Sequence, residues 1–271
     1  MNRVQIGPLN IGKGEPLLFM LGPCVIESEE HSLKTCESIQ QICARLNVPF
    51  VFKSSFDKAN RSSIHSYRGP GLVKGLAILK KVKETFGVPV VTDIHLPEHA
   101  NPVAEVCDIL QIPAFLCRQT DLLEAAARTG RTVSVKKGQF MSPWDMENVV
   151  EKLCESGCRS IILVDRGASF GYQNLVSDMR AIPIMQKMVW PVCFDATHSV
   201  QKPGGLGKTS GGEREFVPLL AKAAVASGAD CIFIETHPDP KTALSDGSSQ
   251  LPLNELESLI ETLLLVHKAV N

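Results

Sequence analysis

The chain has 271 residues, of which 44% are hydrophobic and 21% are charged, and its formal net charge is -1 at pH 7. A near-neutral charge argues against a nucleic-acid-binding surface, and no apolar run reaches the roughly 18 residues that a membrane span needs. A chain of this length can bury a full hydrophobic core in a single domain spanning residues 1–271.

Residues 1–16, MNRVQIGPLNIGKGEP, combine alternating apolar residues with Gly-Pro and Gly-Lys-Gly turns. This pattern predicts a short β-hairpin, which we expect to cap the bottom of the fold. The segment has neither the apolar core of a secretory signal nor the Arg/Ser-rich character of a transit peptide. We therefore expect a soluble, cytoplasmic protein.

Short apolar and β-branched runs follow, each separated from the next by a segment of helical character. The predicted strands are LLFML (17–21), PFVFKS (49–54), VPVVTDI (88–94), DILQI (108–112), TVSVKK (132–137), SIILVD (160–165), PVCFDA (191–196) and CIFIE (231–235). Helical segments include 29–46, 71–86, 119–130, 143–157 and 254–270. Eight β-α units in about 250 residues predict an α/β fold of the (β/α)₈ TIM-barrel type. An open doubly wound sheet would instead need a Gly-rich phosphate fingerprint after the first strand, and GPCVIES is not one.

The segment after the seventh predicted strand, KPGGLGKTS, is similar to a phosphate-binding P-loop. Lys202 stands where that motif needs its first glycine, which argues against a P-loop. We expect residues 203–212 to form a mobile loop over a bound substrate, because glycines permit backbone rearrangement.

The nine cysteines form an odd set without disulfide-scaffold spacing, and most lie in apolar runs such as QICARL and EVCDIL. This usage is typical of reduced, buried cysteines in an intracellular protein. Cys154 and Cys158 are four residues apart, but an isolated pair lacks the four ligands of structural zinc, which favours core packing.

Active sites of such barrels lie at the C-terminal ends of the strands, and in this sequence those ends are mostly polar. The cationic residues there are Lys53, Lys58, Arg61, Lys136 and Arg166. With neighbouring Ser and Asn donors they suit phosphate or carboxylate groups, and they are numerous enough for two separate anions. The alternative is that individual cations form ion pairs with Asp57, Asp93 or Asp165.

A second group of strand-end residues has the character of metal ligands, namely Cys24, His198, Glu235 and Asp246. They follow the first, seventh and eighth predicted strands, which are neighbours in a closed barrel. One thiolate, one imidazole and two carboxylates match a divalent-metal site. The residues alone leave Cys24 open between a metal ligand and a buried thiol, and a nucleophile would need an adjacent base that its own segment does not supply.

The motifs KSSFDKANRSS, QIPAFLCRQTDLL, VKKGQF, FDATHSVQKPGG, IETHPDP and ALSDGSSQLPL resemble those of the 3-deoxy-D-manno-octulosonate 8-phosphate synthase (2-dehydro-3-deoxyphosphooctonate aldolase) family. The resemblance runs from about Leu17 to the last helix. It implies a (β/α)₈ barrel, usually a homotetramer, that condenses phosphoenolpyruvate with D-arabinose 5-phosphate and releases phosphate in Kdo and lipopolysaccharide biosynthesis.

Two rivals to this function remain. The first is 3-deoxy-D-arabino-heptulosonate 7-phosphate synthase, which uses erythrose 4-phosphate and tends to carry Pro-Arg-Thr where this chain has Asn60-Arg61-Ser62. The second is a barrel that only binds a sugar phosphate, but a pure binder has no need of a second anion site beside a metal site.

The resemblance also implies roles for individual residues. Those implied to bind phosphoenolpyruvate or to lie beside it are Lys58, Lys136, Arg166, Lys53, Ser55 and Gln111. Those implied to hold arabinose 5-phosphate are Asn60, Arg61 and Ser62, together with Arg118, which is contributed by a neighbouring subunit.

One position divides this family into two classes. Members with asparagine at the position of Cys24 work without metal, whereas members with cysteine need a divalent ion, so the chain resembles the metal-dependent class. The mixed S, N and O ligands argue against magnesium or calcium and admit zinc, iron(II), manganese or cobalt. The candidate catalytic residues are Lys58, Lys136, Asp93, His95, His198 and Asp246, and the general base stays open between Asp93, His95 and a metal-bound water relayed through Asp246.

Overall fold

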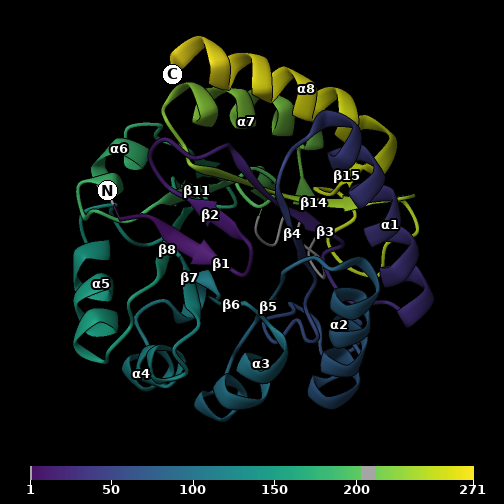
Figure 1. The fold of residues 1–271 in the computed structure, drawn as a ribbon, viewed down its shortest axis with the longest axis horizontal. Helices are drawn as coiled ribbons and strands as arrows, with labels where there is room; N and C mark the ends of the chain where they lie inside the picture. The colour runs from purple at the N-terminus through teal and green to yellow at the C-terminus, as the bar shows by residue number, and fades with distance from the viewer. Residues whose placement is uncertain (1, 203–210) are drawn as a thin grey trace.

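In residues 2–202 and 211–271, which the computed structural model describes, eight parallel strands form a closed barrel (Figure 1). In barrel order they are β3 (Leu18–Gly22), β4 (Phe50–Lys53), β5 (Val90–Asp93), β6 (Ile109–Ile112), β7 (Thr132–Lys136), β8 (Ile161–Asp165), β11 (Val192–Asp195) and β14 (Cys231–His237). Pairing of β14 with both β11 and β3 closes the barrel. The predicted (β/α)₈ barrel is therefore confirmed, with each strand at its predicted place.

The strands are rich in apolar residues, with polar ones mostly toward their C-terminal ends, because a parallel sheet covered by helices is buried on both faces. Every residue of these eight strands is buried. Phe19, Phe52, Phe194 and Phe233 are among the largest fully buried side chains. The strands thus form a rigid, packed scaffold, and the polar residues at their ends inherit that rigidity.

Helices alternate with the strands and surround the barrel, as Figure 1 shows. They are α1 (Glu29–Leu46), α2 (Leu72–Phe86), α3 (Ala100–Val106), α4 (Thr120–Arg128), α5 (Met146–Glu155), α6 (Ala181–Gln186), α7 (Val217–Ala226) and α8 (Leu253–Val270), with short 3₁₀ helices η1 (Pro97–His99), η2 (Ala114–Leu116) and η3 (Arg214–Phe216). At the start of α1, the Ser28 side chain accepts a hydrogen bond from the His31 N–H at 3.0 Å, which satisfies an otherwise unpaired donor. Within the part of the chain that the structure describes, no helix is both long enough and apolar enough to cross a membrane.

The predicted N-terminal hairpin is present as β1 (Val4–Ile6) paired with β2 (Leu9–Ile11). The Gln5 carbonyl accepts a hydrogen bond from the Thr132 hydroxyl at the start of β7, and Gly7 lies beside Pro89, just before β5. The hairpin therefore covers the N-terminal end of the barrel.

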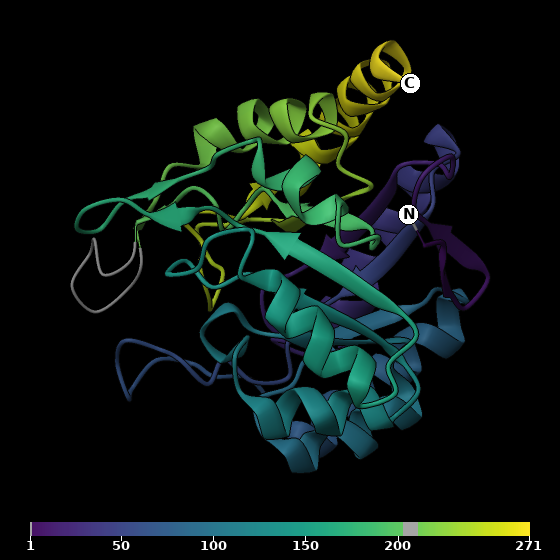
Figure 2. The same cartoon turned by 90° about the vertical axis from the view of Figure 1, so that its left-hand side faces the viewer.

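Long connections lie at the other end, where Figure 2 shows the segment between β4 and α2 extending away from the barrel. Short strand pairs that the sequence did not predict lie among them. These are β9 (Ala168–Ser169) with β10 (Leu175–Val176), β12 (Gln201–Lys202) with β13 (Gly211–Gly212), and β15 (Leu251–Pro252) with the end of β14. Of the predicted mobile loop 203–212, residues 203–210 lie outside the described residues.

Candidate active site

Side chains at the C-terminal end of the barrel enclose a cavity of 380 Å³. Most of the predicted site residues line it. The polar lining consists of Lys58, Asn60, Arg61, Ser62, Ser66, Asp93, His95, Lys136, Gln139, Arg166, His198, Gln201 and Asp246. The segment around η2 supplies an apolar wall that includes Phe115 and Leu116. A concave site with many convergent polar groups suits a small, highly charged ligand.

Lysines from β4 and the loop after it surround one buried carboxylate. Lys53 Nζ lies 2.9 Å from Glu235 Oε1 and 3.0 Å from Ser55 Oγ. Lys58 Nζ is 3.5 Å from the same Glu235 oxygen. Burial opposes the charge of Lys58, but Cys24 and three carboxylates around it raise its pKa well above the usual value. The Lys58 ammonium group therefore stays charged beside the cavity.

Lys136 is the last residue of β7. Its Nζ is 2.6 Å from Asp195 Oδ2 and 4.0 Å from the centre of the Phe233 ring. Burial lowers the pKa of Lys136, although Asp195 acts in the opposite direction. Arg166 donates to the His198 carbonyl at 3.0 Å and to Gln201 Oε1 at 2.7 Å. Its buried Nε has no hydrogen-bond partner within the described part of the chain, so the guanidinium keeps one donor for a ligand.

The alternative that these cations only form ion pairs applies in part. Lys53 lies 3.7 Å from Asp93, as that alternative expects. Asp57 and Asp165, however, pair with Arg68 and Lys137, which do not line the cavity.

Asp93 and His95, the two side-chain candidates for a general base, lie in different electrostatic environments. Asp93 accepts hydrogen bonds from Ser55 Oγ and Gln111 Nε2, each at 2.5 Å. Burial would raise the pKa of Asp93, but the charges of Lys53 and neighbouring lysines outweigh burial and lower it. Burial lowers the pKa of His95, and its Nδ1 finds no hydrogen-bond partner among the described residues. The neutral imidazole is therefore the better proton acceptor of the two.

Three of the four predicted metal ligands form one group of side chains, and the fourth, His198, adjoins its two carboxylates. Cys24 Sγ and carboxylate oxygens of Glu235 and Asp246 all lie within 4.8 Å of one another. His198 Nε2 lies 3.4 Å from Glu235 Oε2 and 4.0 Å from Asp246 Oδ2. These side chains lie close together because β11, β14 and β3 are neighbours in the closed barrel, as the sequence predicted.

The surroundings of these four side chains suit a divalent ion. His198 Nδ1 lies 2.7 Å from Asp195 Oδ2, so a proton on Nδ1 faces Asp195 and the Nε2 lone pair faces the cluster, as is usual for metal-binding histidines. The buried Glu235 Oε2 finds no hydrogen-bond partner in the described residues. Burial and the charge of Glu235 raise the pKa of the Cys24 thiol, which donates to Ser245 Oγ at 3.0 Å. A protonated, hydrogen-bonded thiol is no free nucleophile, and a bound metal ion would displace its proton.

Asp246 is held in an unusual backbone conformation by its neighbours. Its φ of 48° lies in the left-handed region, which non-glycine residues seldom adopt outside constrained sites. Arg61 donates to Asp246 Oδ1 at 3.0 Å and Gln201 donates to Oδ2 at 2.9 Å. Arg61 also donates to Ser245 Oγ at 2.9 Å. Arg61, which is predicted to bind the sugar phosphate, thus connects the predicted sugar-phosphate site to the metal-ligand cluster.

Arg118 is the one predicted site residue that the structure leaves away from the others. It is exposed and does not line the cavity of its own chain. Sequence reasoning missed the contacts of Asp195, Gln201 and Ser245. A signal existed for Asp195, because it stands three residues before His198 at the end of a strand.

Comparisons with known proteins show the family of this chain. The family model described as the DAHP synthetase I family matches residues 3–270. A 2-dehydro-3-deoxyphosphooctonate aldolase from Protochlamydia amoebophila is 59% identical over 260 residues, which cover 96% of this chain and 94% of the relative. This chain is also similar to two other proteins of the same name. The one from Trichlorobacter lovleyi is 58% identical over 260 residues, which cover 96% of each chain. The one from a Cyanothece species is 57% identical over 271 residues, which cover 100% of this chain and 99% of the relative. The chain therefore belongs to the DAHP synthetase I family and, within it, to the 2-dehydro-3-deoxyphosphooctonate aldolases.

Proposed function

We propose that this chain condenses phosphoenolpyruvate with D-arabinose 5-phosphate and water, giving 3-deoxy-D-manno-octulosonate 8-phosphate and inorganic phosphate. The shared name of relatives that match nearly the whole chain supports this reaction over its heptulosonate counterpart. The single structural observation that carries the proposal is one cavity in which two sets of anion-binding donors flank a cluster of metal-type ligands.

The cavity has to hold two polyanions close together. Lys58, Lys136 and Arg166 receive the phosphate and carboxylate of phosphoenolpyruvate. Lys53, Ser55 and Gln111 lie nearby, linked to one another through hydrogen bonds and the Asp93 carboxylate. Asn60, Arg61 and Ser62, from the loop after β4, receive the sugar phosphate. These cations offset the repulsion between the substrates, and the fixed geometry raises the effective concentration of the reacting carbons.

The same site belongs, we propose, to the metal-dependent class, with Cys24, His198, Glu235 and Asp246 holding zinc, iron(II), manganese or cobalt. Support comes from the unpaired Glu235 oxygen, from the orientation of His198 by Asp195, and from the strained backbone of Asp246. Such an ion supplies positive charge that orients and polarises an oxygen ligand beside the reacting carbons. His95 is the general base in this scheme, because its imidazole is neutral and lines the cavity.

Arg118 completes the site in an assembled homotetramer. Its side chain is exposed and lies outside its own cavity, which leaves it available to the sugar phosphate bound by a neighbouring subunit. Loss of arabinose 5-phosphate affinity in Arg118→Ala, without loss of the fold, is the expected consequence.

Phosphate release from phosphoenolpyruvate tests the substrate assignment when the enzyme is given either aldose. We expect rapid release with arabinose 5-phosphate and little with erythrose 4-phosphate. Preference for erythrose 4-phosphate would assign the chain to the heptulosonate reaction instead. No release with either sugar, in protein supplied with divalent metal, would favour a barrel that only binds its ligand.

A further inference from the structure

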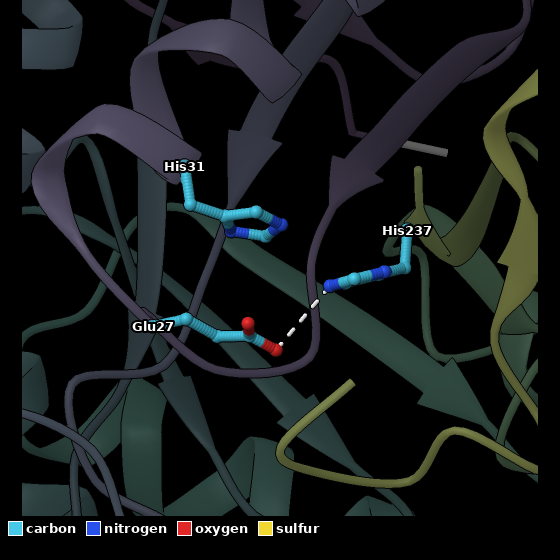
Figure 3. A group of neighbouring side chains, drawn as sticks. All are labelled: Glu27, His31 and His237. Carbon is cyan, nitrogen blue, oxygen red and sulfur yellow. Dashed lines mark ion pairs between the residues drawn. The ribbon is translucent and has the colours of Figure 1, made fainter. Parts of the chain in front are cut away.

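Three side chains outside the cavity lie close to one another, as Figure 3 shows. Glu27 comes from the segment between β3 and α1, His31 from the first turn of α1, and His237 from the end of β14. Glu27 Oε1 lies 3.3 Å from His237 Nε2, and the two imidazole rings have centroids 4.7 Å apart. Among the described residues, none of the three lines the cavity. Their function is therefore separate from direct contact with substrate.

These three residues have the composition of a second metal site, but their hydrogen bonds argue against one. Their ligand atoms lie within 4.8 Å of one another. However, the Asp239 N–H donates to His237 Nδ1 at 3.0 Å, so the neutral ring carries its proton on Nε2. A metal-binding histidine has the opposite arrangement, with the lone pair toward the ion and a proton on the other nitrogen. His237 Nε2–H instead faces the Glu27 carboxylate.

The Glu27 carboxylate reaches the loop that carries Asp246. Its Oε1 accepts a hydrogen bond from the Leu244 N–H at 2.9 Å, in addition to facing His237. Leu244 is held from the other side as well, because Arg61 Nη2 donates to its carbonyl at 3.3 Å. Glu27 thus contacts both the last residue of β14 and the middle of the loop that joins β14 to β15.

Ser245 and Asp246 follow Leu244 in the chain, and both take part in the metal-ligand cluster or contact it. Ser245 accepts from the Cys24 thiol, and Asp246 supplies a carboxylate in a left-handed backbone conformation. A backbone in that region persists only where its surroundings enforce it. The hydrogen bond between Glu27 and Leu244, two residues before Asp246, is one such constraint.

Glu27 is itself held rigidly enough to act as a constraint. The Tyr67 hydroxyl donates to the Ile26 carbonyl at 2.9 Å and to the Glu27 carbonyl at 3.4 Å. The Ile26 N–H donates to the Ser55 carbonyl at 2.9 Å. The backbone that carries Glu27 is therefore tied to the end of β4, and its side chain is largely buried, with 16% of its surface exposed.

From these contacts we infer that Glu27 is a positioning residue, which holds residues 244–246 so that Asp246 and Cys24 can bind one metal ion together. The inference deepens the proposed metal site and rests on it. Glu27 touches neither substrate nor metal, and it acts through the Leu244 N–H and His237.

The test compares Glu27→Ala with Glu27→Gln in the full-length protein. Glutamine keeps an oxygen that accepts from Leu244, so it should restore what alanine loses. We expect Glu27→Ala to weaken zinc binding about 10- to 100-fold in competition with a chelator, as losses of outer contacts at metal sites do. The KM for phosphoenolpyruvate should change little. Glu29→Ala, on the exposed first turn of α1, is the matched control and should behave as wild type.

Hydrogen exchange of the peptide 238–247 in metal-free protein separates this inference from the metal proposal. Glu27→Ala should raise exchange there and in no other strand-end loop, whether or not the wild type binds metal. If Glu27→Ala does not fold, Glu27→Asp keeps the charge with a side chain too short to reach Leu244 and should show the same change. Unchanged exchange and unchanged zinc affinity would overturn the inference. Loss of a second equivalent of zinc from Glu27→Ala and also from His31→Ala would overturn it in favour of a metal site.

Discussion

Asp195→Asn removes one negative charge from the centre of the site while keeping the shape of the side chain. Asp195 is fully buried, and its Oδ2 lies 2.6 Å from Lys136 Nζ and 2.7 Å from His198 Nδ1. Oδ1 accepts from the His198 backbone N–H at 2.9 Å. The substitution therefore leaves a buried ammonium group without its counter-charge and weakens the orientation of the imidazole.

Both losses have expected magnitudes. Breaking a buried ion pair by removing one partner costs about 3–5 kcal/mol of folding stability. Loss of the partner that orients a metal-binding histidine weakens metal binding about 10- to 100-fold. With Asp195 neutral, the burial that already lowers the pKa of Lys136 is opposed only by Asp93 and Glu235, so the pKa of the lysine should fall further.

The assay measures urea unfolding and zinc competition with a chelator on the same preparation. Asp230→Asn is the matched control, because Asp230 is a largely buried carboxylate that accepts from the Val192 N–H at 2.9 Å, at the opposite end of β11. The control should lose stability and keep its zinc affinity. Wild-type zinc affinity in Asp195→Asn would refute the reasoning, because the orientation of His198 would then not depend on Asp195.

Three further perturbations test other parts of the account. In Gly22→Ala the new methyl group would overlap the Lys53 carbonyl, so we expect a loss of about 1–3 kcal/mol in urea unfolding, together with lower activity. Arg61→Ala removes a charged donor worth about 1.5–3 kcal/mol, so the KM for arabinose 5-phosphate should rise roughly tenfold or more in steady-state assays. Burial lowers the pKa of His95, so the unfolded chain, with a value of about 6.5, takes up this proton first as the pH falls. The folding stability that the neutral His95 maintains above about pH 6.5 is then lost on acidification. Because glutamine does not titrate, the fall in melting temperature between about pH 7 and pH 5 should be smaller in His95→Gln.

Each of these has its own control and refuting result. Gly14→Ala, where a methyl group meets open space, separates the steric overlap at Gly22 from backbone strain, and equal effects of the two would contradict the overlap. Arg68→Ala, which only breaks the exposed pair with Asp57, should leave both KM values unchanged. Identical pH profiles of wild type and His95→Gln would show that His95 is not buried in its neutral form.

The sequence could predict the barrel because buried parallel strands have a strong signature. Runs such as SIILVD are short, apolar and separated by helical segments, and such a run corresponds to β8. Once closure was assumed, strand order alone placed Cys24 and His198 near Glu235, and in the structure both side chains lie beside that carboxylate. The short pairs β9–β10 and β12–β13 were not predictable, since two-residue strands carry no periodicity.

The sequence predicted which side chains lie near one another better than it predicted their individual contacts. Lys136 and Lys137 are adjacent in sequence, yet only Lys136 lines the cavity, while Lys137 bonds to the Gly167 carbonyl at 3.0 Å. The link from Glu27 to Leu244 joins residues 217 positions apart through a loop without regular structure. Such contacts depend on loop conformation, which composition and spacing do not determine.

The most direct test of the account is activity before and after removal of metal. Phosphate release from phosphoenolpyruvate and arabinose 5-phosphate is measured in protein whose metal content has been verified by elemental analysis. We predict that chelation abolishes release and that zinc, iron(II), manganese or cobalt restores it, because Cys24, His198, Glu235 and Asp246 hold the ion. Full activity in a verified metal-free preparation would contradict it.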